Sequence, residues 1–489
     1  MTAPIPAAAE EAHQTFRDAL ASIQKDGRRR WIYARQPAGR YYRARTLVSV
    51  ALLAFLVAAP FVRFRGQPLV LLNVIERRFV LLGLEFWPQD FHLVVLIALA
   101  AIVTLALSTA TVGRVWCGWL CPQTVFMEMV FRRLEYWIDG SAEQQVRRDA
   151  APWTAATWIR AGLKHALFFA LSFAIANLFL AYVIGAGALW TIVTDPPSRH
   201  LAGLALITMF SLLFYGVFAR FREQACTLAC PYGRVMSSLI DRHTITVTYD
   251  AVRGEPRGRL SREAAGTTPA DAAPNGDCVD CARCVTVCPT GIDIRNGIQL
   301  ECVNCTACMD ACDAVMTQLR RPPGLIALTS HETTHTRRRS WLTARVGAYA
   351  GVWAVLVAIV VTLIVRRHDL DVLILRQPGT LYATLDDGGI ANFYTVQVLN
   401  RSPRAHALDY RAVTPAGARL VPLGPIGRVD AHGLIESRLL VQLPREVLQG
   451  GATPLRLEVR ADGVLLATID SSFLGPAPSR PAGAARPEP

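Results

Sequence analysis

Five long apolar stretches constrain the fold of this chain more than any other feature of its sequence. A bilayer core of ~30 Å is crossed by about 20 residues of helix, and each stretch reaches or approaches that length. They predict an α-helical membrane bundle of five spans, at Leu47–Val62, Phe91–Val112, His165–Ala186, Leu201–Phe218 and Val346–Val365. A further apolar stretch, Leu69–Leu84, is interrupted by Glu76, Arg77 and Arg78, and we expect an interfacial helix there.

The composition agrees with a membrane protein. Hydrophobic residues make up 52% of the 489 residues, which excludes a mostly disordered chain. Long polar stretches at both ends and in the middle exclude a bundle of spans alone. The formal net charge is +13, and such an excess is also typical of a nucleic-acid surface. Because the basic residues gather beside the spans, we interpret them as a topology signal and expect no nucleic-acid partner.

The same basic residues predict the orientation of the chain. Nine Lys and Arg precede residue 47, whereas the loop 187–200 contains only Arg199. Basic residues collect on the cytoplasmic side of membranes, so we expect a cytoplasmic N-terminus and, after five spans, a C-terminus on the outer side. No cleavable signal peptide is expected, because the first apolar run begins too far from Met1.

Eight of the 12 cysteines form two ferredoxin-type runs. Each run has the spacing Cys-x2-Cys-x2-Cys-x3-Cys, and in two-cluster ferredoxins the last Cys of each run binds the other cluster. Disulfides are disfavoured because this loop is predicted to be cytoplasmic, and zinc sites rarely have such quartets. The predicted ligands are Cys278, Cys281, Cys284 and Cys312 for the first [4Fe–4S] cluster, and Cys288, Cys302, Cys305 and Cys308 for the second.

The remaining four cysteines form two Cys-x3-Cys-Pro pairs, Cys117/Cys121 and Cys226/Cys230. Each pair follows the cytoplasmic end of a predicted span, and residues i and i+4 share a helix face. Pro122 and Pro231 suit the first turn of a following helix, and the stretch after Pro122 is apolar on one face. That face comprises Phe126, Val130, Leu134 and Ile138, and the helix is expected to lie along the membrane surface.

Four thiols at one membrane face are a candidate redox or metal site. Soft thiolates select Cu(I), Zn(II) or Fe–S clusters, and a dithiol–disulfide couple is a further possibility. Two copies with the same spacing and depth disfavour the alternative that these cysteines are only small buried hydrophobes. We therefore take Cys117, Cys121, Cys226 and Cys230 as candidate catalytic and metal-binding residues.

Weaker signals are interpreted structurally. His331-Glu332-x-x-His335 matches the zinc-protease pattern, but its two adjacent Thr residues do not favour the required helix, so we expect a solvated linker. Met127 and Met129 are possible thioether ligands that are expected to pack instead. His165 and His200, at the ends of spans, are interpreted as polar groups with local partners.

The C-terminal part alternates with period two, as in Leu455–Val459, and Asp462-Gly463 offers a hairpin turn. About seven short strands predict an immunoglobulin-like sandwich. The expected organisation is a basic arm (1–46), four spans with both thiol pairs (47–254), a linker and two-cluster ferredoxin domain (255–336), a basic flank and fifth span (337–367), the sandwich (368–475) and a disordered tail (476–489).

Several motifs together resemble one family, the cytochrome c oxidase accessory proteins of the CcoG/FixG/RdxA type. They are residues 114–124 (RVWCGWLCPQT), 221–233 (FREQACTLACPYG), 249–258 (YDAVRGEPRG) and 323–326 (PGLI), with both cluster runs. Asp313, which replaces the usual Pro after the second run, is in keeping with this family. The resemblance implies a homodimeric protein of the bacterial inner membrane that carries two [4Fe–4S] clusters and supports assembly of cbb3-type cytochrome c oxidase.

The resemblance also implies a reaction, the reduction of Cu(II) to Cu(I) before copper passes to assembly chaperones. In that hypothesis a cytoplasmic donor supplies electrons to the clusters and copper is held at the four membrane-proximal thiols. Two alternatives stay open: a quinol-linked electron conduit for a respiratory reductase, and a redox sensor based on labile clusters.

Overall fold

The computed structural model describes residues 21–24, 26, 28–64, 66–258, 276–338, 342–449 and 451–476. The chain divides into two compact units, residues 1–362 and 363–489. The first 20 residues of the expected arm, most of the expected linker and the expected tail after residue 476 lie outside the described residues.

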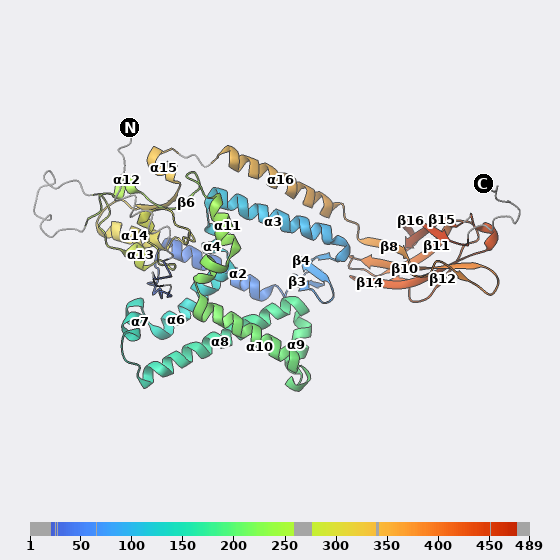
Figure 1. Cartoon of the computed structure of the whole chain (residues 1–489), viewed down its shortest axis with the longest axis horizontal. Coiled ribbons are helices and arrows are strands. Elements are labelled where there is room, and N and C mark those ends of the chain that lie inside the picture. The colour runs from blue at the N-terminus through green and yellow to red at the C-terminus, as the bar shows by residue number, and fades with distance from the viewer. Residues whose placement is uncertain are drawn as a thin grey trace, which may run out of the picture. The chain divides into compact units, whose positions relative to one another are not determined.

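Five helices in the described part of the chain are long and apolar enough to cross a membrane, as predicted. Two of them differ from prediction at the N-terminal end, where the first begins at Arg40 and the third at Ala155. The five are α2 (Arg40–Ala58), α3 (Phe91–Val112), α8 (Ala155–Ile184), α10 (Leu201–Gly216, extended to Phe221 by the π-helical turn η4, Val217–Phe221) and α16 (Ala344–Val365) (Figure 1).

The early start of α2 has a local cause. The Asp310 carboxylate accepts the backbone N–H groups of Tyr41 and Tyr42 at 3.1 and 2.8 Å. A buried anion at the first turn satisfies two otherwise unpaired donors and interacts favourably with the helix dipole. The basic residues that were assigned to the arm, Arg40, Arg43 and Arg45, therefore belong to the helix.

The prediction of an interfacial helix at Leu69–Leu84 is wrong. This stretch forms an antiparallel sheet of β3 (Val70–Asn73), β4 (Arg78–Leu81) and β5 (Leu84–Phe86). The reason is turn chemistry: Arg77 lies at φ 56° in the first turn, and Leu82 and Gly83 lie at φ 52° and 80° in the second. Consecutive left-handed residues reverse a strand and terminate any helix.

The stretch after Pro122 is helical but contains a π-helical section. It comprises α5 (Pro122–Thr124), η2 (Val125–Phe131) and α6 (Arg132–Asp139). The Phe131 ring stacks on Phe218 of η4 with centroids 4.5 Å apart, and meets Phe168 of α8 edge-on at 5.0 Å. These aromatic contacts belong to one buried cluster, which packs the two thiol-bearing segments together.

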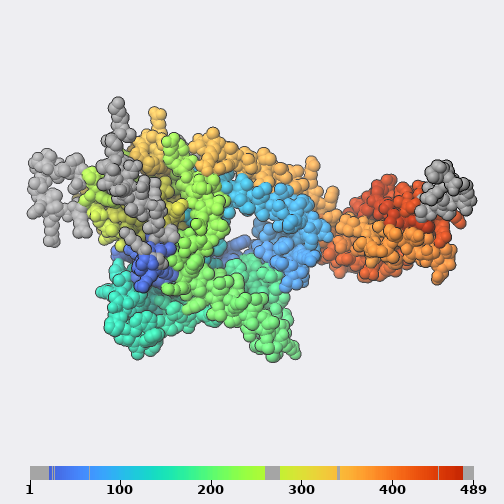
Figure 2. Space-filling model, in the orientation of Figure 1, coloured from blue at the N-terminus to red at the C-terminus, as the bar shows by residue number. Residues whose placement is uncertain are grey.

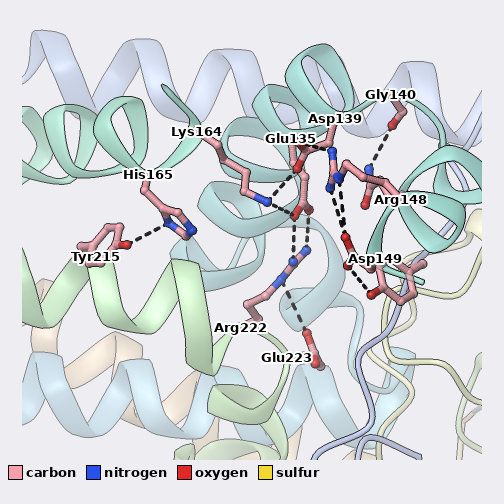
Figure 3. A network of polar contacts seen from close by, with 12 residues as sticks. Glu135, Asp139, Gly140, Arg148, Asp149, Lys164, His165, Tyr215, Arg222 and Glu223 are labelled. Atoms are coloured by element: carbon pink, nitrogen blue, oxygen red, sulfur yellow. Dashed lines mark hydrogen bonds and ion pairs between the residues drawn. The ribbon is translucent and has the colours of Figure 1, made fainter. Parts of the chain in front are cut away.

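A buried ionic network ties the same segments by charge (Figure 3). Arg222, which follows η4, donates two hydrogen bonds to the Glu135 carboxylate at 2.9 and 3.2 Å, and both residues are buried. Lys164 of α8 approaches Glu135 at 3.8 Å, and Glu223 accepts from Arg29 at 2.7 Å. The residues directly before Cys226 are thus fixed to α6, to α8 and to the arm.

The described part of the arm, residues 28–39, packs against its neighbours. Tyr136 donates to the Ala34 carbonyl, and the Arg35 N–H donates to the Thr286 carbonyl, both at 2.8 Å. Figure 2 shows this segment in dark blue beside the teal helices and the yellow-green ferredoxin-like part. The arm therefore connects the cluster-binding part to the helices near the membrane.

The ferredoxin-like part is built from a two-stranded sheet and two helices. β6 (Thr246–Tyr249) pairs antiparallel with β7 (Ile326–Thr329), and α13 (Arg283–Thr286) and α14 (Ala307–Gln318) lie between them in sequence. Both strands and both helices contribute to one buried core, in which cysteines pack beside aliphatic residues. Shorter helices of this unit are α4 (Val115–Trp119), α7 (Ala142–Asp149), α9 (Ala186–Thr194), η5 (Ala225–Ala229), α11 (Pro231–Val235), α12 (Ala251–Gly254) and α15 (His331–Thr336).

The second unit is the predicted two-sheet sandwich. Its sheets have the strand orders β12-β14-β10-β8, with β9 beside β10, and β13-β11-β15-β16. The predicted hairpin at Asp462-Gly463 joins the last two strands, and both residues have the left-handed φ that such a turn requires. The strands are β8 (Leu370–Arg376), β9 (Ala383–Thr384), β10 (Ile390–Asn400), β11 (His406–Thr414), β12 (Arg419–Pro422), β13 (Arg428–Val429), β14 (Leu434–Leu443), β15 (Ala452–Ala461) and β16 (Val464–Leu474).

The buried ionic network makes a prediction about stability. Arg222→Met leaves the Glu135 carboxylate buried without its bidentate partner, which costs about 3–5 kcal/mol. Arg411→Met breaks an exposed pair with Asp409 and serves as the control, with an expected cost below about 1 kcal/mol. Unfolding of the full chain in detergent would measure both, and equal destabilisation by the two variants would contradict this account of the network.

Candidate redox site

Four cysteines line the first cavity of the ferredoxin-like part. This cavity has an empty volume of about 360 Å³, and its other walls are mainly apolar. A second cavity of about 350 Å³ is described below. The cysteines of the first cavity are Cys278, Cys281, Cys284 and Cys312, the set predicted for the first cluster. Of the eight ferredoxin-type cysteines, only Cys281 is exposed to solvent. The first cavity is therefore the one with a solvent-exposed ligand residue.

The second cavity is lined by Cys288, Cys302, Cys305 and Cys308, together with Cys284 from the first set. Each cavity thus contains three cysteines of one run and the fourth cysteine of the other. This is the exchange that a two-cluster ferredoxin requires. All eight cysteines are free, so the donor set fits two [4Fe–4S] clusters.

Five of the cluster-side thiols have a raised pKa because they are buried. Burial raises the pKa of Cys302, Cys284 and Cys312 to about 12 each, and it raises the pKa of Cys305 to about 11. Burial also raises the pKa of Cys308 well above its ordinary value. Iron must therefore displace protons from these thiols, and loading becomes easier as the pH rises.

The two Cys-x3-Cys-Pro pairs are brought together near the ends of α3 and η4. Cys117 lies in α4 and Cys121 caps the start of α5, while Cys226 lies in η5 and Cys230 directly follows it. Pro122 and Pro231 open the following helices, as predicted. Burial raises the pKa of Cys226 to about 12, with further contributions from the other three thiols of the group.

Among the described residues, no three His, Cys, Asp or Glu side chains converge tightly enough to hold a single metal ion. The four membrane-proximal thiols are thus neighbours without forming a closed metal cage.

Gly118, between the first two of these thiols, lies directly against the second cavity. A Cβ at Gly118 would clash with the Val303 carbonyl oxygen and would lie 2.9 Å from the backbone N and Cα of Cys305. No residue larger than Gly fits there. The first thiol pair and the loop of the second cluster set are therefore in backbone contact.

Two buried arginines at this contact were not predicted as site residues. Arg114 is 3% exposed and donates to the Leu300 carbonyl in the loop before Cys302, and its charge opposes the rise that burial causes in the pKa of Cys117. Arg45 is 2% exposed, and its Nε donates to the Gly118 carbonyl at 2.7 Å. The sequence feature that could have identified them is their position at the end of an apolar stretch. We interpreted basic residues at such positions only as a sign of membrane orientation.

Met127 and Cys226 line a further small cavity, with Thr290 and Val303 from the ferredoxin-like part on its other side. Met129 is buried and lies outside this lining. His165 accepts or donates a hydrogen bond with Tyr215 at 2.8 Å (Figure 3), and His200 lies 3.2 Å from Asp195. Both histidines thus have the local partners that were expected.

The expected solvated linker contains a short helix at His331–Thr336, which its two adjacent Thr residues do not favour. The Ser330 side chain accepts the Thr333 N–H and starts the short helix α15, which brings the two imidazole centroids within 4.6 Å. An N-cap supplies what the Thr residues lack in helix propensity. In the part of the chain that the structure describes, these histidines form no group of three ligands.

Comparison with known proteins gives the family. Residues 221–331 match the family described as a 4Fe-4S dicluster domain, residues 91–140 a 4Fe-4S binding domain, and residues 360–476 the "IG-like fold at C-terminal of FixG". Protein RdxA of Cereibacter sphaeroides is 33% identical over 91% of this chain and 97% of RdxA. This chain belongs to the FixG/RdxA family. Nitrogen fixation protein FixG of Rhizobium meliloti is 32% identical over 78% of this chain and 79% of FixG. Protein RdxB of C. sphaeroides is 34% identical over 80% of this chain and 83% of RdxB.

Membership of the FixG/RdxA family confirms the resemblance found in the sequence motifs. The 4Fe–4S domain matches identify an iron–sulfur electron-transfer protein, and the C-terminal match confirms an immunoglobulin-like domain. The five apolar helices are consistent with a membrane protein of this family.

The contact at Gly118 predicts a selective defect. Gly118→Ala forces the first thiol segment away from the Cys305 backbone, so we expect the second cluster to be lost while the first is retained. Iron and sulfide analysis with EPR spectroscopy would show about half of the wild-type content. Gly216→Ala, at a glycine with open space around it, is the matched control. Full iron content in Gly118→Ala would contradict the packing described.

Proposed function

We propose that this protein reduces Cu(II) to Cu(I) at its four membrane-proximal thiols and thereby serves assembly of a cbb3-type cytochrome c oxidase. Two [4Fe–4S] clusters would be held by the eight ferredoxin-type cysteines in the sets that line the two cavities. When bound, they supply electrons one at a time, which matches the single electron that each Cu(II) ion takes up.

One observation carries this proposal: the Cys117–Cys121 segment packs on the backbone of Cys305. At Gly118 the thiol segment touches the cluster loop directly, and Arg114, three residues before Cys117, donates to the Leu300 carbonyl of the same loop. A redox-active ion held by these thiols would therefore lie beside the source of its electron.

The thiols supply selectivity for the product. Thiolate sulfur favours Cu(I) over harder ions, so binding itself favours reduction. The raised pKa of Cys226 means that copper must displace a proton there. Capture of copper at this residue is then expected to weaken as the pH falls.

The proposal includes an orientation and partners. The N-terminus and the ferredoxin-like part would be cytoplasmic and would accept electrons from a cytoplasmic donor. The immunoglobulin-like domain would lie in the periplasm, and copper chaperones or oxidase assembly factors would receive the Cu(I). The protein would act as a homodimer.

Replacement of either thiol pair tests the copper chemistry. We expect Cys117→Ser/Cys121→Ser, and likewise Cys226→Ser/Cys230→Ser, to slow Cu(I) formation at least about a hundredfold, because loss of even a second-shell partner costs 10–100-fold. The measurement is stopped-flow mixing of the anaerobic, reduced full-length protein with Cu(II) and a Cu(I)-specific chelator.

Thr227→Val, between the two cysteines of the second pair, is the control that removes no thiol. Cu(I) formed at the wild-type rate by both double variants would exclude these thiols as the copper site. Loss of clusters in the variants would instead show that the thiols serve the clusters themselves.

A second candidate function, oxidation of a membrane quinol, is favoured by one cavity. This cavity lies between α8, α9 and α10, has an empty volume of about 2290 Å³ and is mostly apolar, with the Asp195–His200 pair among its polar residues. An apolar cavity with a few polar groups suits an isoprenoid quinol, whose hydroxyl protons would pass to such a pair. The 21 residues of Leu201–Phe221 place about 32 Å of helix between this pair and the thiols, which puts this function second.

Anaerobic addition of a short-chain quinol to the oxidised protein tests the second candidate. If quinol is the donor, EPR spectroscopy shows cluster reduction in the wild type and in the control His92→Phe. His200→Phe is expected to slow this reduction at least about a hundredfold, the lower end of what a proton acceptor typically contributes. Clusters that stay oxidised in the wild type exclude quinol as the donor.

A further inference from the structure

We propose that Arg45 and Arg114 raise the reduction potential of the cluster held by Cys288, Cys302, Cys305 and Cys308 above that of its partner. The second cluster would then collect the electron beside the membrane-proximal thiols. This inference rests on the two-cluster assignment made above, but it does not depend on the identity of the electron acceptor.

Arg45 comes from the first apolar helix and lies behind Gly118, outside the lining of the second cavity. Its Nε donates to the Gly118 carbonyl, and Gly118 packs on the Cys305 backbone. Its Nη2 is buried without a hydrogen-bond partner among the described residues. The guanidinium therefore lies beside the segment that contacts the loop of the second cysteine set.

Arg114 follows the second apolar helix and approaches a different cysteine of the same set. It donates to the Leu300 carbonyl, two residues before Cys302. Its Nε is also buried without a partner in the described part of the chain. Neither Arg45 nor Arg114 has a carboxylate within ion-pair distance among the described residues.

The first cavity has a different charge environment. Two arginines line it, the exposed Arg283 and the half-buried Arg295. Two carboxylates neutralise the Arg295 guanidinium, because Asp280 lies 2.5 Å and Asp293 lies 2.7 Å from its nitrogens. The first cavity thus has one solvated and one paired arginine, whereas the arginines beside the second cysteine set are buried and unpaired among the described residues.

Unpaired buried guanidinium groups need an anionic partner, since burial of an isolated charge is costly. A [4Fe–4S] cluster with four thiolate ligands is such an anion, and it becomes more negative by one charge when it accepts an electron. Nearby cations in a medium of low dielectric constant stabilise that added charge. Two uncompensated arginines therefore favour reduction at the second cavity, whereas the neutralised Arg295 contributes little at the first.

The test is an EPR-monitored potentiometric titration of the full-length protein in detergent, without copper. In Arg45→Met and in Arg114→Met we expect the midpoint of one cluster to become more negative and that of the other to stay fixed. The ratio of protein reduced at one cluster to protein reduced at the other should change at least tenfold. This corresponds to a shift of about 59 mV in the midpoint potential of a one-electron couple. Cys281→Ser marks the signal of the first cluster, because Ser ligation alters that signal alone.

Arg43→Met is the matched control, since it removes the same charge from the exposed face of the same helix. Arg45→Lys, which keeps the charge, should restore most of the potential. Equal shifts at both clusters, or shifts no larger than that of Arg43→Met, would overturn the inference.

A measurement on the wild type covers the case in which the Met variants fail to assemble. In the half-reduced protein, the EPR signal should be the one that Cys281→Ser leaves unchanged. If the signal of the half-reduced protein is instead altered by Cys281→Ser, the first cluster is reduced before the second. The proposed order of reduction would then be wrong. Absence of two [4Fe–4S] clusters from the wild type would instead overturn the cofactor assignment, which separates the two failures.

Discussion

The two hydrogen bonds from the start of α2 to the Asp310 carboxylate hold the cluster-binding part on the first apolar helix. Asp310 belongs to α14, the helix that also carries Cys308 and Cys312. Since residues i and i+4 share a helix face, the cap at Tyr41 also directs Arg45 toward the same part. One carboxylate thus fixes both the position of the cluster loops and the direction from which a buried cation approaches them.

Irregular helix geometry accumulates around the thiols. The π-helical sections η2, η4 and η5 flank or contain the Cys-x3-Cys-Pro segments, and each inserts an extra residue per turn relative to an α-helix. Aromatic stacking of Phe131 on Phe218 and the Arg222–Glu135 pair hold these strained sections in place. Such wide turns are common at functional sites, and here they allow two chain segments to approach one cluster loop closely.

Much of this architecture could be predicted from residue patterns. Apolar length gave the five helices, cysteine spacing gave the composition of both cavities, and period-two alternation gave the C-terminal sandwich. Contacts between residues far apart in sequence could not be predicted. Asp310 moved the start of the first helix to Arg40, left-handed residues turned Leu69–Leu84 into a sheet, and a Ser330 cap produced the helix at His331. Arg45 and Arg114 escaped notice because a basic residue beside a span has the same sequence pattern whether it marks topology or faces a cluster.

The arm has a consequence for biogenesis. Residues 28–39 are among the first to be synthesised, yet they contact Thr286 and precede the helix that Asp310 caps. Synthesis at ~5–20 residues per second separates Gly39 from Asp310 by roughly 15 to 55 s. During that interval four apolar helices must insert while the arm lacks its final partners. A complete set of eight cysteines exists only once Cys312 has been made, so maturation of the cofactor centre follows the first four apolar helices and precedes the fifth.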